Sequence, residues 1–163
     1  MTALLPGISA PQFKLPLAGG GEFSLKQALE KGPVVLAFFK ISCPVCQYAL
    51  PFIDRLAHSL KERGVAVVGI SQDDEQNTLL FRRTLGLKLP IAHDDDGYAV
   101  SRAYGLTNVP TVFDVATDGR IIASIVGWSK TDIEAIYARY AKGVPHGAPL
   151  FAANEEVAEF RPG

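Results

Sequence analysis

Cysteine is scarce in this chain, and the two cysteines that it has lie three residues apart. Because Cys43 and Cys46 are the only ones among 163 residues, no framework of disulfides holds the fold together and the pair is free for chemistry. That usage is typical of a reducing compartment, so we expect a cytoplasmic location. The opening residues, MTALLPGISAPQF, lack both the basic start and the long apolar run of a signal peptide or membrane anchor.

An excess of charge of either sign is also missing. Lysine and arginine number 16 against 17 acidic residues, which gives a net charge of −1. This balance leaves no electrostatic footprint for nucleic acid or an anionic membrane, so we expect neither as a partner. With 48% apolar residues, the chain can bury one sizeable core. We expect one domain over residues 1–143, followed by a tail, 144–163, that packs on it.

Apolar runs alternate with helical patterns along the chain. Residues 33–39 and 65–71 are predicted to be strands buried on both faces, with a helix between them that ends at Gly64. Further helices are predicted over 24–31, 74–85, 97–104 and 131–141, a short strand over 90–93, and hairpins around 18–22 and between 111–115 and 120–126. This order predicts an α/β fold with a mixed central sheet covered by helices on both faces.

The motif CPVC joins the first buried strand to the following helix. Pro44 falls at the first helical position, where its missing N–H costs nothing. Cys43 therefore lies at the helix N-terminus, where unpaired backbone N–H groups favour a thiolate. Cys46 follows about one turn later, close enough to bond to Cys43 but less exposed. We predict that Cys43 attacks a substrate disulfide and that Cys46 resolves the resulting mixed disulfide.

Other uses of two neighbouring cysteines are possible in principle. Free cysteines are often buried in a core, but C-x-x-C at a strand-to-helix junction is typical of redox proteins. A structural zinc site needs four ligands, and the three scattered histidines form no second motif. His93 and the acidic residues 94–96 are interpreted as a solvated turn. We therefore expect no metal and no bound cofactor, and a thiol-metal carrier or binding module is the non-enzymatic alternative.

Several segments resemble the thioredoxin-like family that groups alkyl-hydroperoxide-reductase and thiol-specific-antioxidant proteins with thiol-disulfide oxidoreductases. The resemblance runs from about Leu4 to Lys142 and is carried by GISAPQFKLP, CPVC, Pro51, LPIAHDDDGYAVSRAYGL, VPTVF and DGRI. It implies a thioredoxin fold with an N-terminal extension and an inserted strand and helix.

The resemblance also implies a substrate site around the cysteines. Pro110 is expected to be a cis-proline that faces the disulfide, which would leave the backbone of Val109 free to pair with an extended substrate. We expect substrate to be bound by Pro44, Val45, Val109 and Pro110. Suitable partners are a protein or small-molecule disulfide or dithiol, together with an external thiol reductant such as a thioredoxin-reductase-type system. A monomer or weak homodimer is expected.

The same family contains peroxidases, so the motif has to be compared with theirs. Peroxiredoxins carry P-x-x-x-T-x-x-C and an arginine near the cis-proline position. Here Phe39 and Cys43 replace the proline and the threonine, and Cys46 falls at the peroxidatic position. The resemblance thus favours a thiol-disulfide oxidoreductase, with a peroxiredoxin-like thiol peroxidase as the alternative. Ala37 and Ala49 stand where relatives place carboxylates, so no obvious proton acceptor for Cys46 is apparent.

The tail lies beyond the family resemblance. Asn154 is predicted to cap a short helix with Glu155 and Glu156 in its first turn, which would present Val157 and Phe160.

Overall fold

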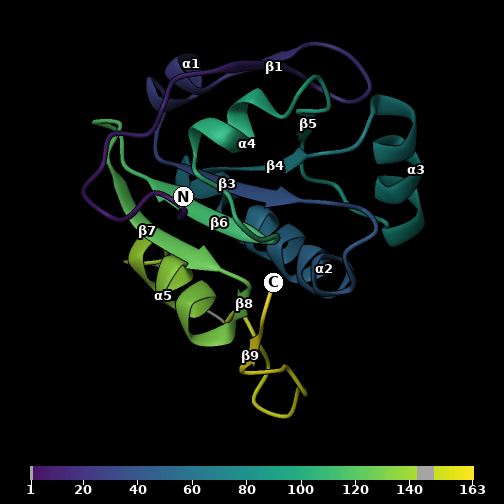
Figure 1. The fold of residues 1–163 in the computed structure, drawn as a ribbon. Helices are drawn as coiled ribbons and strands as arrows, with labels where there is room; N and C mark the ends of the chain where they lie inside the picture. The colour runs from purple at the N-terminus through teal and green to yellow at the C-terminus, as the bar shows by residue number, and fades with distance from the viewer. Residues whose placement is uncertain (1, 143–148) are drawn as a thin grey trace.

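A five-stranded mixed sheet forms the centre of the protein in the computed structural model, which describes residues 2–142 and 149–163 (Figure 1). The strands are β3 (Val34–Phe39), β4 (Ala66–Ser71), β5 (Ile91–His93), β6 (Thr111–Val115) and β7 (Ile121–Val126), in the order β5-β4-β3-β6-β7 across the sheet. Strands β3, β4 and β5 pair in parallel, whereas β6 pairs antiparallel with β3 and β7 antiparallel with β6. The predicted mixed sheet is therefore confirmed.

Helices cover both faces of this sheet. They are α1 (Leu25–Leu29), α2 (Pro44–Leu60), α3 (Glu75–Leu85), α4 (Ala99–Ala103) and α5 (Lys130–Tyr140), with the 3-10 helix η1 (Lys61–Arg63) continuing α2. Helices α2 and α5 lie on one face, α1 and α4 on the other, and α3 beside the β5 edge (Figure 1). None of the helices within the described residues combines the length and the apolar composition needed to cross a membrane.

Strand β3 separates two apolar cores. All six of its residues are fully buried. Because successive side chains of a strand point to opposite faces, Ala37 and Phe39 pack with α2 and α5, whereas Leu36 and Phe38 pack with α1 and α4. Burial on both faces explains the uninterrupted apolar run of the sequence. Strand β3 is the central strand of the sheet, and the chain continues from its C-terminal end to Cys43, where helix α2 begins.

The predicted helices begin and end at capping residues in the structure. The Asp74 side chain accepts a hydrogen bond from the Asn77 N–H at the start of α3, and Gly86 ends that helix in the left-handed conformation. Gly64 follows η1 in the same conformation. Near the N-terminus, β1 (Lys14–Pro16) pairs antiparallel with β2 (Glu22–Ser24), which confirms the predicted hairpin.

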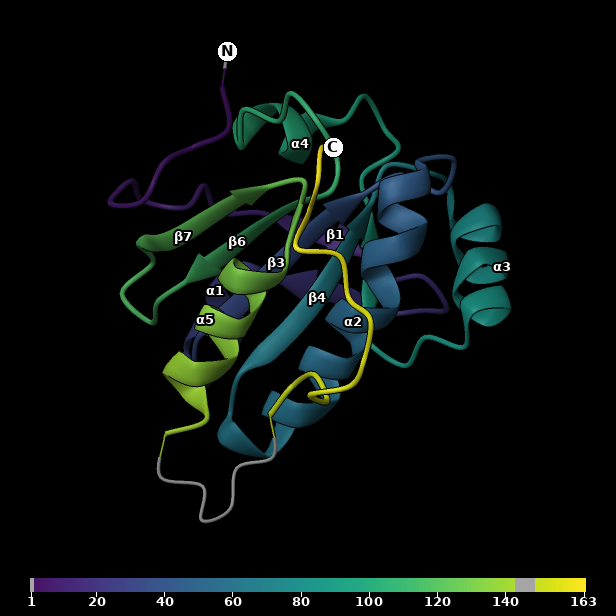
Figure 2. The same cartoon turned by 90° about the horizontal axis from the view of Figure 1, so that it is seen from below.

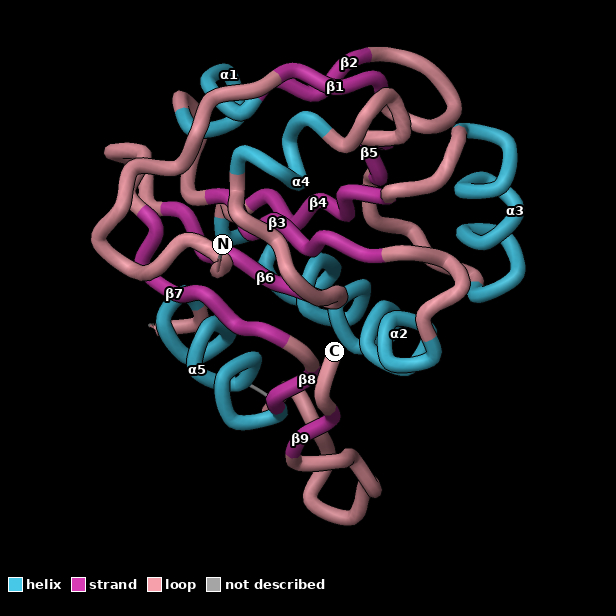
Figure 3. Tube along the Cα trace, viewed as in Figure 1, coloured by secondary structure: helices cyan, strands magenta, loops and turns pink. Residues whose placement is uncertain are grey.

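The C-terminal tail adopts an extended structure, so the predicted helix at Asn154 is wrong. Residues 149–163 form loops and one strand, β9 (Phe160–Arg161), which pairs antiparallel with β8 (Trp128–Ser129) (Figure 3). Glu155, predicted to lie in the first turn of that helix, accepts two hydrogen bonds from Arg55 of α2, at 2.7 and 2.8 Å, and one from the Ala152 N–H at 3.2 Å. Figure 2 shows this segment crossing the molecule between α5 and α2.

The tail contacts the domain at its beginning as well as at its end. Leu150 and Phe151 are buried in the core formed by α2 and α5. The domain boundary that we predict at residue 143 lies outside the described residues.

Candidate active site

Cys43 caps the N-terminus of α2. Its backbone is extended, with φ −84° and ψ 117°, and its sulfur accepts a hydrogen bond from the Cys46 N–H at 3.1 Å. Pro44 occupies the first helical position, where the N–H that proline lacks would have had no hydrogen-bond partner within the helix. The sulfur of Cys43 is half-buried, whereas Cys46 is fully buried beneath it. The two cysteines therefore have the geometry expected from the sequence, with one sulfur at the surface and the other below it.

The environment of Cys46 keeps its thiol protonated. Burial raises the pKa of Cys46 strongly, and the hydrogen bond with Cys43 and the electrostatic interactions with Cys43 and Asp73 act in the same direction. A hydrogen bond from the Lys40 backbone opposes them only in part. Cys46 is consequently a poor nucleophile in this environment, because the thiolate is the reactive form.

A loop from a distant part of the sequence lies against Cys43. The peptide bond between Val109 and Pro110 is cis, as the family resemblance implies. The Val109 carbonyl oxygen lies 3.4 Å from the Cys43 sulfur and accepts its S–H. Val109 is half-buried and Pro110 is buried. The structure thus brings the predicted loop and the predicted cysteine pair together.

The remaining predicted residues lie on the first turn of α2. Pro44 is exposed and Val45 is half-buried. Pro44 follows Cys43 directly and Val45 is two residues further along, whereas the Val109 carbonyl approaches the Cys43 sulfur from a different loop.

Asp73 is part of the site and was not predicted from the sequence. Its Oδ2 accepts a hydrogen bond from the Ile41 N–H at 2.8 Å. Ile41 also accepts a hydrogen bond from the Gln47 side chain at 2.8 Å, and the Lys40 carbonyl accepts one from the Cys43 N–H at 3.2 Å. The carboxylate therefore holds the loop that carries Cys43. A signal existed, because Asp73 follows β4 closely and the carboxyl ends of neighbouring parallel strands meet at one sheet edge.

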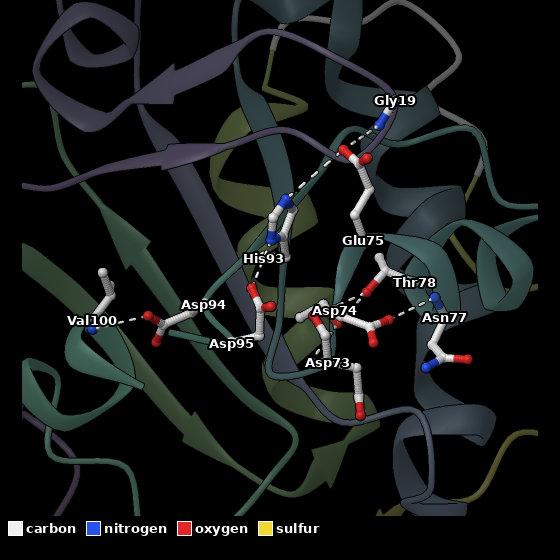
Figure 4. Close-up of polar contacts among 11 residues, drawn as sticks. Gly19, Asp73, Asp74, Glu75, Asn77, Thr78, His93, Asp94, Asp95 and Val100 are labelled. Carbon is white, nitrogen blue, oxygen red and sulfur yellow. Dashed lines mark hydrogen bonds and ion pairs between the residues drawn. The ribbon is translucent and has the colours of Figure 1, made fainter. Parts of the chain in front are cut away.

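His93, Asp94, Asp95 and Glu75 make polar contacts within the protein (Figure 4). His93 Nδ1 lies 2.7 Å from Asp95 Oδ1, and Nε2 lies 3.9 Å from Glu75 Oε2. Asp94 is only 2% exposed, so the interpretation of this stretch as a solvated turn is wrong for that residue. Its carboxylate accepts hydrogen bonds from the start of α4 instead, including the Val100 and Ser101 N–H groups.

Among residues 2–142 and 149–163, no three histidine, cysteine, aspartate or glutamate side chains are grouped so as to hold a metal ion.

Comparisons with known proteins identify the class of protein that this fold and site define. A Chlorobium tepidum structure, provisionally described as a thiol:disulfide interchange protein DsbE, superimposes with a TM-score of 0.75 at 26% sequence identity, covering 84% of this chain and 96% of the other. The fold is therefore thioredoxin-like. Residues 6–124 match the model of the AhpC/TSA family, and the chain belongs to that family.

The curated relatives carry two different names. Thiol-disulfide oxidoreductase ResA of Bacillus thuringiensis (strain Al Hakam) is 31% identical over 122 residues, which cover 74% of this chain and 69% of the relative. The protein MT2597 of Mycobacterium tuberculosis, provisionally named a peroxiredoxin, is 33% identical over 135 residues, which cover 76% and 85%. The chain is thus a homologue of thiol-disulfide oxidoreductases that carries a C-x-x-C pair.

Proposed function

We propose that this protein is a thiol-disulfide oxidoreductase in which Cys43 attacks the substrate and Cys46 resolves the intermediate. The proposal rests on the difference in solvent exposure between the two cysteines. Cys43 is half-buried at a helix start and accepts the Cys46 N–H at 3.1 Å, whereas Cys46 is fully buried beneath it. A substrate disulfide can reach only the first sulfur, and only the second can reach the intermediate from within the protein.

The reaction balances with the two cysteines as the electron source. The Cys43 thiolate attacks one sulfur of the substrate disulfide, so that a Cys43–substrate disulfide forms and the other substrate sulfur leaves as a thiolate. Cys46 then gives up its proton and attacks the Cys43 sulfur, which forms the Cys43–Cys46 disulfide and releases the second substrate thiolate. Two electrons pass to the substrate, and its two thiolates take up protons. An external dithiol returns the enzyme to its reduced form.

The surroundings of Cys43 suggest how substrate is held. Pro44 and Val45 follow Cys43 on the first turn of α2, and the Val109 carbonyl oxygen lies 3.4 Å from the Cys43 sulfur. We propose that protein or small-molecule disulfides are bound between them. A cytoplasmic location, with a thioredoxin-reductase-type system as reductant, belongs to the same proposal because no other cysteine is present to form a structural disulfide.

The relationship to MT2597 makes a hydroperoxide the competing substrate. Peroxide reduction would require the cysteine at the peroxidatic position, Cys46, to be an accessible thiolate. Instead Cys46 is 0% exposed and burial raises its pKa. Disulfide exchange is therefore the better supported activity.

A redox titration against glutathione tests the proposal. The wild type should show one two-electron transition by mass after alkylation, and neither Cys43→Ser nor Cys46→Ser should show it. Turnover of a protein disulfide with a dithiol donor should vanish in Cys43→Ser. Stopped-flow consumption of hydrogen peroxide at catalytic rates, or tight stoichiometric binding of copper or zinc without disulfide reduction, would overturn the proposal.

A further inference from the structure

The last four residues of the chain, Phe160–Gly163, lie beside the proposed active site, and we refer to them as the C-terminal strap. Strand β9 within the strap pairs with β8, Trp128 opposite Arg161 and Ser129 opposite Phe160. At the end of the strap, the Asn108 side-chain amide donates a hydrogen bond to the Gly163 carbonyl oxygen at 3.1 Å. Figures 1 and 2 both show the C-terminus next to the loop that precedes β6.

The backbone of the strap lies directly against the carbonyl of Val109. A Cβ atom built on Gly163 would lie 2.7 Å from the Val109 oxygen, so only a residue without a side chain fits there. The same oxygen lies 3.4 Å from the Cys43 sulfur. On the other side, a Cβ built on Gly127 would lie 2.6 Å from the Arg161 oxygen. Gly163 thus allows the strap to approach the Val109 carbonyl closely, and Gly127 allows it to approach the turn between β7 and β8.

The chain is anchored just before the strap, at Ala158, whereas the strap itself is exposed. The Ala158 N–H donates to the Tyr48 hydroxyl at 2.8 Å, and the Ala158 carbonyl accepts from the Trp128 ring N–H at 2.7 Å. Beyond this anchor all four strap residues are exposed, and Phe160 is 60% exposed. The Arg161 guanidinium lies 4.1 Å from the centre of the Tyr48 ring, on the helix that carries both cysteines.

We propose that the C-terminal strap selects the substrate of the Cys43 site by occupying the surface on which an extended polypeptide would pair with Val109. An added strand runs about 4.8 Å from the backbone that it pairs with, and the strap fills that space next to Val109. Small disulfides need no such pairing and reach Cys43 with the strap in place. Extended polypeptides have to displace the strap first. This inference rests on the proposed disulfide exchange and adds the substrate class to it.

Two substrates with the same leaving group separate these cases. One is the mixed disulfide of thionitrobenzoate with cysteamine; the other is its mixed disulfide with a neutral, unstructured peptide that has one central cysteine. Release of thionitrobenzoate is followed for the wild type, for Arg161→Ala, and for Arg63→Ala as a control that removes an exposed arginine elsewhere. Loss of the contact with Tyr48 should raise the peptide rate about two- to five-fold relative to the cysteamine rate. An equal ratio in all three proteins would overturn the inference.

A structural measurement follows the strap itself. In full-length Cys46→Ser, Cys43 is trapped as a disulfide either with cysteamine or with the peptide, and amide signals are compared by NMR. The signals of Phe160–Gly163, and of the Asn108 side-chain amide, should keep their positions in the first adduct and move to those of a free chain in the second. Strap signals that are the same in both adducts would overturn the inference.

The outcome for the strap can be told apart from the outcome for the proposed function. If Cys43→Ser releases thionitrobenzoate as fast as the wild type from both substrates, disulfide exchange at Cys43 is wrong. If release depends on Cys43 but its substrate ratio is insensitive to Arg161, only the strap inference is wrong.

Discussion

Asp73 fixes the position of Ile41 in the loop that leads into the cysteine motif, because its Oδ2 accepts the Ile41 N–H at 2.8 Å. The two residues are 32 positions apart in the sequence and follow the neighbouring strands β4 and β3. The same carboxylate is close enough for its charge to raise the pKa of Cys46. Asp73 therefore acts on the site in two ways, by holding the loop and by disfavouring the Cys46 thiolate.

Substitutions at Asp73 should separate the two effects. Asp73→Asn keeps a hydrogen-bond acceptor for Ile41 but removes the charge, so the pKa of Cys46 should fall. Alkylation of Cys46 in the Cys43→Ser background, measured at one mildly alkaline pH, should then be faster than with Asp73 present. Asp74→Asn is the matched control, since asparagine still caps α3. An alkylation rate that does not change with Asp73→Asn would contradict the electrostatic role.

Asp73→Ala should have a second consequence that Asp73→Asn lacks. It removes the acceptor for the Ile41 N–H, and a hydrogen bond to a charged group stabilises by about 1.5–3 kcal/mol. Because Asp73 is only half-buried and water can replace it, we expect the lower end of that range in urea unfolding. Equal stability of the alanine and asparagine variants would show that the loop does not depend on this contact.

The two cysteines should differ in reactivity in the folded protein. In Cys46→Ser the remaining Cys43 is half-buried and should react with iodoacetamide readily, whereas in Cys43→Ser the remaining Cys46 is fully buried. Because the thiolate is the reacting species and burial raises the pKa of Cys46, its alkylation at neutral pH should be slower by more than about ten-fold. Unfolding both variants in urea should bring the rates together. Similar rates in the folded variants would reverse or remove the assigned roles.

The local parts of this structure could be predicted from the sequence. The apolar run of β3, Pro44 at a helix start and Gly86 at a helix end each specify their own conformation through the residues next to them. The spacing of Cys43 and Cys46 likewise determines that one sulfur lies about a turn from the other. These features need no knowledge of distant contacts.

The parts that were missed or wrong depend on distant contacts. Asp94 is buried because the start of α4 supplies donors that replace water. Glu155 takes part in no helix because Arg55, 100 positions earlier, binds its carboxylate. Asp73 belongs to the site only because β4 lies beside β3 in the sheet. In each case the deciding partner is chosen by the tertiary fold, which overrides local preference.

A buried carboxylate beneath α5 should make stability depend on pH. Asp114 in β6 is 0% exposed, accepts the Tyr140 hydroxyl at 2.6 Å and pairs with Arg139. Burial raises its pKa more than these partners lower it. The folded state therefore binds the Asp114 proton more tightly than the unfolded state does, so this group contributes stability at low pH that is lost as pH rises through its folded pKa.

Arg139→Ala should destabilise the protein most at neutral pH. It leaves the Asp114 charge buried without its cation, a change that costs about 3–5 kcal/mol when a pair is fully buried. Because Arg139 is 36% exposed, we expect about 2–3 kcal/mol in urea unfolding. Without the arginine the pKa of Asp114 rises further, so the loss should shrink at mildly acidic pH, where the carboxyl group is protonated in the folded state. A loss that is independent of pH, or one matched by Arg63→Ala, would contradict this account.

Phe151 should contribute more to stability than any exposed aromatic residue of the tail. Its ring packs against Phe52 and Trp128, with centroids 5.5 and 6.2 Å apart, and the side chain is only 5% exposed. If residues 149–163 fold cooperatively with the domain, Phe151→Ala should cost about 3 kcal/mol, at the low end for buried aromatics because the tail can relax. Phe160→Ala, at a residue that is 60% exposed, should change stability by less than about 0.5 kcal/mol. Urea unfolding of both variants measures the difference, and equal effects would mean that the tail is a separate appendage whose contacts do not stabilise the domain.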